Sequence, residues 1–365
     1  MKQNIKALAA LMIAGLQLAN SNSANAQTDS SSPLKISGYV ETYYSYDFGR
    51  PLNHTKPGFF YSYNRHNEVN LNLGFVKAAY LKNNVRANLA LATGTYMNAN
   101  LASEAGVLKN IFEANAGVKI SKTKNIWIDA GIFASHIGFE SAIGKDCPTL
   151  TRSILGDNSP YYESGVKLSY TSSNEKLFLS GLILNGWQRI QRVYGNNTPA
   201  FGHQLTYKPT SKITLNSSSF VGSDKADSVR QMRYFHNFYT QIQLSNTVGL
   251  TAGFDIGAEQ KAKHSNNFNC WYSPVLILKF NTSTKSAIAV RGEYYSDKNG
   301  VIINSGTLNG FKTFGYSLNY DYAFADNILF RIEGRGLNSK DQIFANKNIP
   351  SNNNFALTTS LAVSF

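Results

Sequence analysis

The sequence lacks any long apolar run that could form a membrane-spanning helix. After residue 26 no window of about twenty apolar residues occurs, which is the length that an α-helix needs to cross a bilayer. The mean hydropathy is only −0.26. These values exclude a helical membrane protein. They do not exclude a membrane β-barrel, because only every second residue of a membrane-spanning strand has to be apolar.

Cysteine and proline are also scarce, with two cysteines and nine prolines. Cys147 and Cys270 belong to no CxxC pair and to no His/Cys cluster, so the sequence predicts no metal site. Export would place the chain in an oxidising compartment. Three alternatives therefore stay open: a Cys147–Cys270 disulfide, two unpaired thiols in loops, or one thiol that faces the barrel interior. The prolines fall mostly in expected loops.

Motifs that carry enzymatic chemistry are missing as well. The sequence has no G-x-S-x-G, HExxH, G-x-G-x-x-G or Walker-type element. Ser135 and His136 are the nearest pair that could act as nucleophile and base, but adjacent residues of a strand point to opposite faces. A barrel hydrolase is thus the weakest of the functions considered, and the sequence predicts neither an enzyme nor a cofactor.

The amino terminus has the three parts of a secretory signal peptide. Lys2 and Lys6 are its positive charges, residues 7–19 form an apolar stretch, and Ala24-Asn25-Ala26 fits the small-x-small cleavage pattern. The apolar stretch is too short to span a bilayer. We therefore expect residues 1–26 to be a signal peptide and residues 27–365 to form the mature domain.

The formal net charge is +13, and removal of Lys2 and Lys6 with the signal peptide lowers it to +11. A basic balance can indicate nucleic-acid binding, but an exported chain without a Lys/Arg cluster has no such partner. The excess charge can act on anionic solutes inside a channel or on lipid phosphates outside it. Both possibilities stay open from the sequence.

Apolar and polar residues alternate from Leu34 to the end of the chain, which is typical of strands with one apolar face. In the last segment Leu357, Leu361 and Phe365 share an apolar face opposite Thr358 and Ser360. A chain that ends in such a strand on an aromatic residue resembles a bacterial outer-membrane barrel. In those barrels the last aromatic residue belongs to the signal read by the barrel assembly machinery. The resemblance makes Phe365 the expected assembly signal and that machinery an expected partner.

The connections between the strands alternate in length. Short polar turns separate long Gly- and Asn-rich segments, which lie at residues 48–67, 97–109, 138–160, 188–199, 222–231, 260–268, 298–310 and 338–352. Short periplasmic turns and long outer loops are typical of single-chain outer-membrane barrels. The sequence therefore predicts an all-β fold, a transmembrane antiparallel up-and-down β-barrel of about sixteen strands. A soluble β-sandwich is the alternative, disfavoured by the signal peptide and by Phe365.

Two stretches resemble a known family. One is the segment 131–141, GIFASHIGFES, and the other is the segment 151–162, TRSILGDNSPYY, followed later by Asn185-Gly186-Trp187. Together they resemble the OmpL-like β-barrel porins found in Bacteroidetes and relatives, in which G-x-F-x-x-x-x-G-x-E precedes T/S-R-S and N-S-P-Y-Y elements. The resemblance implies an outer-membrane barrel that acts as a channel. It assigns no substrate.

Charged residues on the expected water-facing side of the strands are candidates for the pore lining, since charged rings in a pore select ions. These candidates are Arg86, Glu113, Lys119, Asp129, Lys167, Arg291, Glu293, Arg331, Glu333 and Arg335. The last five are the best constriction candidates, because their strands are close in sequence and could form a ladder of Arg and Glu on one wall. The alternative is that these charges only solvate the lumen and pair across strands.

The segment 138–160 mixes charges with apolar residues that need a place to be buried. A barrel of this size is wide enough to hold a folded-in loop. The segment either narrows the pore or caps the barrel, and its charged candidates for a constriction are Glu140, Lys145, Asp146, Arg152 and Asp157.

The sequence predicts a porin in the cell outer membrane, in contact with its lipids. It should pass small hydrophilic solutes by diffusion, with a mild preference for anions. The alternative is a receptor or adhesin barrel that binds partners with its long outer loops.

Overall fold

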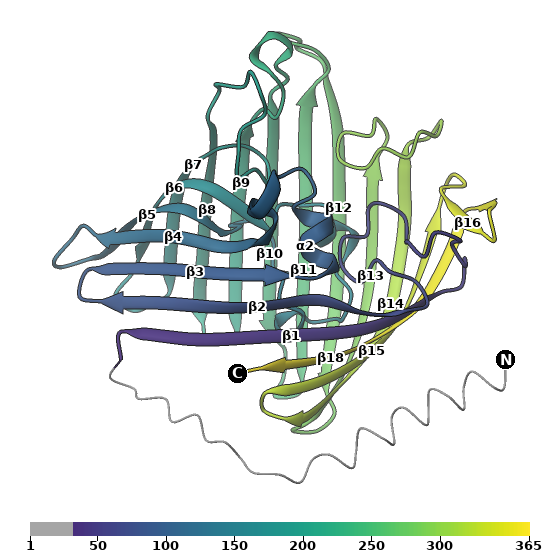
Figure 1. Ribbon diagram of the computed structural model, residues 1–365, viewed down its shortest axis with the longest axis horizontal. Coiled ribbons are helices and arrows are strands. Elements are labelled where there is room, and N and C mark those ends of the chain that lie inside the picture. Colours follow the sequence, from purple (N-terminus) through teal and green to yellow (C-terminus); the bar gives the residue numbers. More distant parts are fainter. Residues whose placement is uncertain (1–31) are drawn as a thin grey trace. The chain divides into compact units, whose positions relative to one another are not determined.

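Sixteen antiparallel strands close into one barrel (Figure 1). The computed structural model describes residues 32–365, so the expected signal peptide over residues 1–26 lies outside the described residues. The barrel strands are β1 (Leu34–Asp47), β2 (Val69–Lys82), β3 (Val85–Thr93), β4 (Ile111–Lys119), β5 (Asn125–Ala134), β6 (Tyr162–Thr171), β7 (Leu177–Leu184), β8 (Ala200–Thr210), β9 (Ile213–Gly222), β10 (Arg233–Gln243), β11 (Val248–Gln260), β12 (Phe268–Asn281), β13 (Ser286–Asp297), β14 (Phe311–Ala325), β15 (Ile328–Ser339) and β18 (Asn353–Ser364). The predicted fold class and strand number are confirmed.

Strand β14 illustrates why these sequences form a barrel wall. Its residues Phe314, Tyr316, Leu318 and Tyr320 are exposed, whereas the alternate residues Thr313, Gly315, Ser317, Asn319 and Asp321 are buried. Because successive side chains of a strand point to opposite faces, the apolar set forms the outer surface and the small polar set faces the lumen. The same alternation recurs on the neighbouring strands.

The first and last barrel strands close the ring. Strand β1 pairs with β18 over nine residue pairs, from Tyr39↔Ser364 to Asp47↔Ala356. The terminal Phe365 extends this closure, because its N–H donates to the Gly38 carbonyl at 3.0 Å and its own carbonyl accepts from the Gly38 N–H at 2.7 Å. The Phe365 ring lies over Gly38, where a Cβ would come within 2.3 Å of it. Glycine at position 38 thus leaves room for the last aromatic ring.

The connections follow the predicted alternation. Short turns join β2 to β3, β4 to β5, β6 to β7 and the later pairs at one end of the barrel, and the long connections lie at the other end. The long connections carry the remaining elements, namely α2 (Thr95–Asn100), α3 (Ile154–Asp157), 3-10 turns at Gly106–Asn110, Gly144–Asp146 and Asp227–Val229, and a hairpin of β16 (Phe344–Asn346) and β17 (Ile349–Ser351). Among residues 32–365 no helix is long and apolar enough to cross a bilayer.

The lumen is filled largely by the long connections. Tyr63 from the β1–β2 connection, Tyr96 and Met97 from α2, and Leu150 and Ile154 from the β5–β6 connection are all buried. They pack into clusters with lumen-facing residues of the wall such as Leu73 and Phe311. The core of this protein therefore lies inside the barrel, where residues of the long connections pack against the lumen-facing side of the strands.

Candidate functional site

The connection between β5 and β6, residues 135–161, crosses the lumen, and we call it the lumen loop. Near its start it bonds to β9 and β10, where the Ser218 hydroxyl donates to the His136 carbonyl at 2.7 Å and the Gly138 N–H donates to the Asn237 side chain at 3.2 Å. In a ring of sixteen strands the position opposite β5 is β13. The loop reaches that opposite wall, because Leu155 packs on Val275, Ile277 and Ala289 of β12 and β13.

Arg291 of β13 is the main attachment point on that wall. Its guanidinium donates to the Thr149 hydroxyl at 2.9 Å, to the Thr151 carbonyl at 2.6 Å and to the Thr151 hydroxyl at 3.0 Å. It also pairs with Glu333 of β15 at 3.0 Å, and Glu333 in turn accepts the Thr151 N–H at 2.5 Å. One buried arginine and one buried carboxylate thus hold the middle of the lumen loop.

Two further arginines complete the attachment. Arg331 pairs with Asp321 at 2.7 Å and donates to the Gly144 carbonyl at 2.7 Å. Arg335 pairs with Glu293 at 2.7 Å, and Glu293 accepts the Ile154 N–H at 2.6 Å. Hydrogen bonds to ionised groups are stronger than neutral ones. The ladder therefore binds the backbone of the lumen loop along several residues.

One prediction is wrong: the ladder of five charged residues on β13 and β15 does not line an open pore. Arg291, Glu293, Arg331, Glu333 and Arg335 do lie on one wall and do pair across strands, but each is at most 4% exposed. The physical reason is that a loop inside a lumen brings backbone N–H and C=O groups that need partners. The charged wall supplies those partners and is covered in doing so.

The other five pore-lining candidates lie on the wall formed by β3–β6. Arg86, Glu113, Lys119 and Lys167 are half-buried, and Asp129 is buried. Arg86 pairs with Asp129 through two oxygens, Glu113 pairs with Lys77 of β2, and Lys167 lies 4.6 Å from the Phe133 ring centre. This wall, and not the β13–β15 wall, keeps charged side chains that are partly open.

The charged residues of the lumen loop divide into two groups. Glu140, Arg152 and Asp157 are buried. Arg152 donates to the Ser141, Leu150 and Ala142 carbonyls and so ties the loop to itself, while Glu140 accepts from the Ser153 N–H and hydroxyl. Lys145 and Asp146 are the second group. They line a cavity between the lumen loop and the short-turn end of the barrel, which we call the inner side of the loop. Three of the predicted constriction residues are thus buried and hold the structure together, and the other two line a cavity.

The disulfide alternative is wrong. Cys147 is buried in the lumen loop, where the Cys147 carbonyl accepts from Arg331, and Cys270 lies on the exposed face of β12. Both thiols are free because they lie on opposite sides of the barrel wall. Burial raises the pKa of the Cys147 thiol to about 11. No group of three potential metal ligands occurs among residues 32–365.

Burial also shifts the pKa of two charged groups in the long connections. It raises the pKa of Asp157 to about 7. Arg335, Arg152 and the Ser62 hydroxyl, which donates to this carboxyl at 3.2 Å, act in the opposite direction and lower the pKa. Burial lowers the pKa of Lys56 to about 8. Both residues line the cavity at the outer side of the lumen loop.

We expect the Asp157 carboxyl to make stability depend on pH. Its pKa rises from 3.8 in the unfolded chain to about 7 in the folded protein, so the folded state holds the proton between these values and loses stability as pH rises through that window. Thermal unfolding in detergent should therefore give a lower melting temperature at pH 8 than at pH 5. Asp157→Asn should raise the melting temperature at pH 8 and flatten the profile. An unchanged profile would contradict the assignment.

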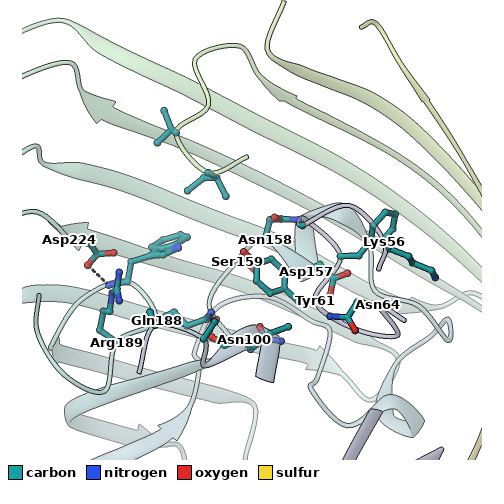
Figure 2. Close-up of a pocket in the computed structure, with 18 of the residues that line it drawn as sticks. Lys56, Tyr61, Asn64, Asn100, Asp157, Asn158, Ser159, Gln188, Arg189 and Asp224 are labelled. Carbon is teal, nitrogen blue, oxygen red and sulfur yellow. Dashed lines mark hydrogen bonds between the residues drawn. The ribbon is translucent and has the colours of Figure 1, made fainter. Parts of the chain in front are cut away.

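Two cavities lie on the two sides of the lumen loop. The outer one, of about 520 Å³, is lined by Tyr61, Asn64, Asn100, Asn158 and Arg189 among others, and Figure 2 shows these side chains around it. The inner one, of about 380 Å³, lies between the loop and β9–β12 near the short turns, and Lys145, Lys212, Gln243 and Lys279 line it. One cavity is thus lined by residues of the long connections, and the other lies near the short turns.

Sequence reasoning missed Asn319 and Asp321, both on the lumen face of β14. Asp321 pairs with Arg331 and with Lys279, and the Asn319 side chain accepts the Leu150 N–H at 3.0 Å. The alternation of apolar and polar residues in β14 could have identified both, because it places them on the same side as Ser317.

Solved structures with the same fold are outer-membrane porins and channels. An anion-selective porin from Comamonas acidovorans has 8% identity and a TM-score of 0.58, covering 91% of this chain and 99% of that chain. Salmonella typhi OmpF in complex with daunomycin has 10% identity and a TM-score of 0.61, covering 91% and 97%. The outer membrane channel DcaP of Acinetobacter baumannii has 10% identity and a TM-score of 0.57, covering 91% and 97%. At these identities the likeness concerns the fold.

The search of curated proteins gives no match. A family match does exist, and it spans residues 33–365, which is the whole barrel together with the segments 131–141 and 151–162. The chain therefore belongs to the family described as "Putative beta-barrel porin-2, OmpL-like".

Proposed function

We propose that this protein is a porin of the outer membrane through which small hydrophilic solutes diffuse, with a mild preference for anions. The observation that carries the proposal is the pair of cavities on the two sides of the lumen loop, one among the long connections and one near the short turns. Barrels of sixteen strands are wide enough for an aqueous channel. The lumen loop narrows the passage between the two cavities.

The outer surface supports the proposed location. An apolar band such as Phe314, Tyr316 and Leu318 on β14 is exposed, and in water such a surface would be costly. We place this band in the outer membrane, against its lipids, with the short turns and Phe365 on the periplasmic side. The barrel assembly machinery is the proposed partner that recognises the last strand and Phe365 during insertion.

The anion preference rests on the open charges and not on the buried ladder. The inner cavity is lined by Lys145, Lys212 and Lys279, with Asp146 as its one acidic lining residue in the described part of the chain. Lys279 is paired with Asp321 at 3.2 Å, so Lys145 and Lys212 supply most of the positive potential. Positive side chains along a water-filled path favour anions over cations.

Reversal potentials in planar bilayers test the proposal. In a KCl gradient we expect a chloride-leaning potential for the wild-type protein and a potential nearer to zero for Lys145→Gln/Lys212→Gln, because the inner cavity loses two positive charges. Lys263→Gln is the control, since Lys263 is exposed in the β11–β12 connection and lines neither cavity. A silent wild-type protein would refute the channel, and a cation preference unchanged by the double substitution would refute the selectivity.

A receptor role for the outer loops is the second candidate, and the outer cavity favours it. The Asn64 and Asn100 side-chain oxygens are buried there without a hydrogen-bond partner among the described residues, next to Tyr61 and Trp187. Such acceptors beside aromatic rings suit a hydroxyl-bearing ligand. A receptor barrel would bind without conducting, so the same bilayer recordings separate the two functions.

A further inference from the structure

A group of polar residues interrupts the outer surface of the barrel on β8–β10, three strands that lie side by side (Figure 1). We call it the polar patch, and it consists of His203, Ser217, Ser219 and His236. His203 is exposed and the other three are half-buried. On β9 and β10 these residues alternate with lumen-facing neighbours such as Asn216, Ser218 and Asn237, which are buried. The polar patch therefore faces outward, where the rest of the barrel presents apolar side chains.

The polar patch lies within the apolar band and not at its edge. Phe201 and Leu205 flank His203 on β8, Tyr234 and Phe238 flank His236 on β10, and all four are exposed. On β9 the apolar residues Val221 and Leu215 flank the two serines in the same way. Lipid-facing positions of membrane barrels are apolar. Polar side chains at this depth would leave their hydrogen-bonding groups facing hydrocarbon, which is unfavourable.

The residues of the polar patch are arranged in register. His203 and His236 both stand opposite Ser219, and their ring centres are 5.5 Å apart. The Ser219 hydroxyl lies 2.5 Å from His203 Nδ1, and the Ser217 hydroxyl lies 2.9 Å from His236 Nε2. The other nitrogen of His236 makes no hydrogen bond to a described residue. The internal bonds thus order the polar patch and leave capacity for an external partner.

The surface beside the polar patch is recessed. Gly181 of β7 stands opposite His203, and a Cβ added to Gly181 would meet no atom within 4 Å. Below the polar patch a hollow of about 420 Å³ is lined by Leu205, Leu215, Phe238 and Phe254. In membranes, small residues that allow close approach and polar side chains such as Ser and His that can hydrogen-bond to a neighbour mark contacts between spanning segments.

We propose that the outer faces of β7–β10 form the contact between two copies of this chain in the membrane, centred on the polar patch. The partner must offer hydrogen-bonding groups at the same depth inside the apolar band, which acyl chains cannot do. All copies of a barrel insert with the same orientation, so a second copy presents the same residues at the same depth. Serine hydroxyls and imidazoles both donate and accept hydrogen bonds, so the polar patch is complementary to itself.

The symmetry of the contact follows from its composition. When the same patch is used by both partners, a twofold axis relates them and the assembly closes at two copies. The axis here runs along the membrane normal, through the polar patch. Each copy keeps its own lumen, so the contact is independent of the channel proposal.

The test measures the mass of the full-length mature protein in mild detergent and in lipid nanodiscs. We expect a dimer for the wild-type protein. Gly181→Trp places a ring in the recess and should raise the dissociation constant by about tenfold or more, as a loss of ~1.4 kcal/mol would do. Gly292→Trp is the matched control, because Gly292 on β13 also has nothing within 4 Å of its added Cβ and lies outside the proposed contact.

A second variant tests the polar chemistry itself. The double variant His203→Leu/His236→Leu places apolar side chains in the lipid-facing band, so it should fold. It removes the hydrogen-bonding groups through which the two polar patches would contact each other, so it should also yield monomers. Heat-induced shifts in electrophoretic mobility check that each variant forms a barrel. A wild-type monomer in lipid, a trimer, association with a different protein, or equal effects of Gly181→Trp and Gly292→Trp would each overturn the proposal.

Discussion

Replacing Arg291 by alanine should release the lumen loop and enlarge the channel. The Arg291 side chain supplies three hydrogen bonds to residues Thr149 and Thr151 of the loop and two ion pairs, to Glu333 at 3.0 Å and to Glu293 at 3.4 Å. Its removal leaves Glu333 buried without that partner, and breaking a buried ion pair costs roughly 3–5 kcal/mol. The Glu333 carboxylate regains water only if the loop moves away from the wall. We therefore expect a higher single-channel conductance together with a lower thermal stability.

Two companion variants make this result interpretable. Arg291→Lys keeps the positive charge but loses the planar fork that reaches both threonines, so it should lie between the wild type and Arg291→Ala. Arg50→Ala removes an exposed arginine from the β1–β2 connection and should change neither conductance nor stability.

A loop-shortened protein separates the effect on the channel from an effect on folding. Replacing residues 142–152 by a short Gly-Ser link removes the crossing segment while Arg291 stays in place. It should raise the conductance as Arg291→Ala does. If both variants fold and conduct like the wild type, the lumen loop does not restrict the passage.

The barrel could be predicted from the sequence because its physics is local. Each strand needs only alternation of small polar and apolar residues, as in Ser317, Leu318, Asn319 and Tyr320 of β14. The alternating connection lengths then fix which ends of the strands lie together. A closed ring also leaves no unpaired edge in lipid, so neither strand pairing nor strand order required long-range information.

The attachment of the lumen loop could not be predicted, because it depends on which wall a long segment reaches. Arg291 and Glu333 lie on β13 and β15, with β14 between them, and Ser317 of β14 stands level with Arg291. That small residue leaves room for two long side chains to meet across a strand. The sequence identifies the charges and their face, but the burial of a charge pair depends on Thr149 and Thr151, which are about 140 residues away in the chain.

The second large effect concerns the outer surface, where Leu318→Arg should destabilise the barrel by about 2–4 kcal/mol. Leu318 lies at the centre of β14, is 60% exposed and stands between the exposed rings of Tyr316 and Tyr320. A guanidinium at that point would enter the middle of the hydrocarbon layer. Urea unfolding from lipid vesicles should show the loss as a lower midpoint.

Leu308→Arg is the matched control for this effect. Leu308 is even more exposed, at 93%, but it belongs to the long connection between β13 and β14, where an arginine reaches water. The two leucines have similar chemistry and high exposure, so only their depth distinguishes them. A large loss for Leu318→Arg with none for Leu308→Arg would place the outer face of β14 in the bilayer. An equally small loss for both variants would mean that this face meets water, and the placement of the outer face of β14 in the bilayer would have to be abandoned.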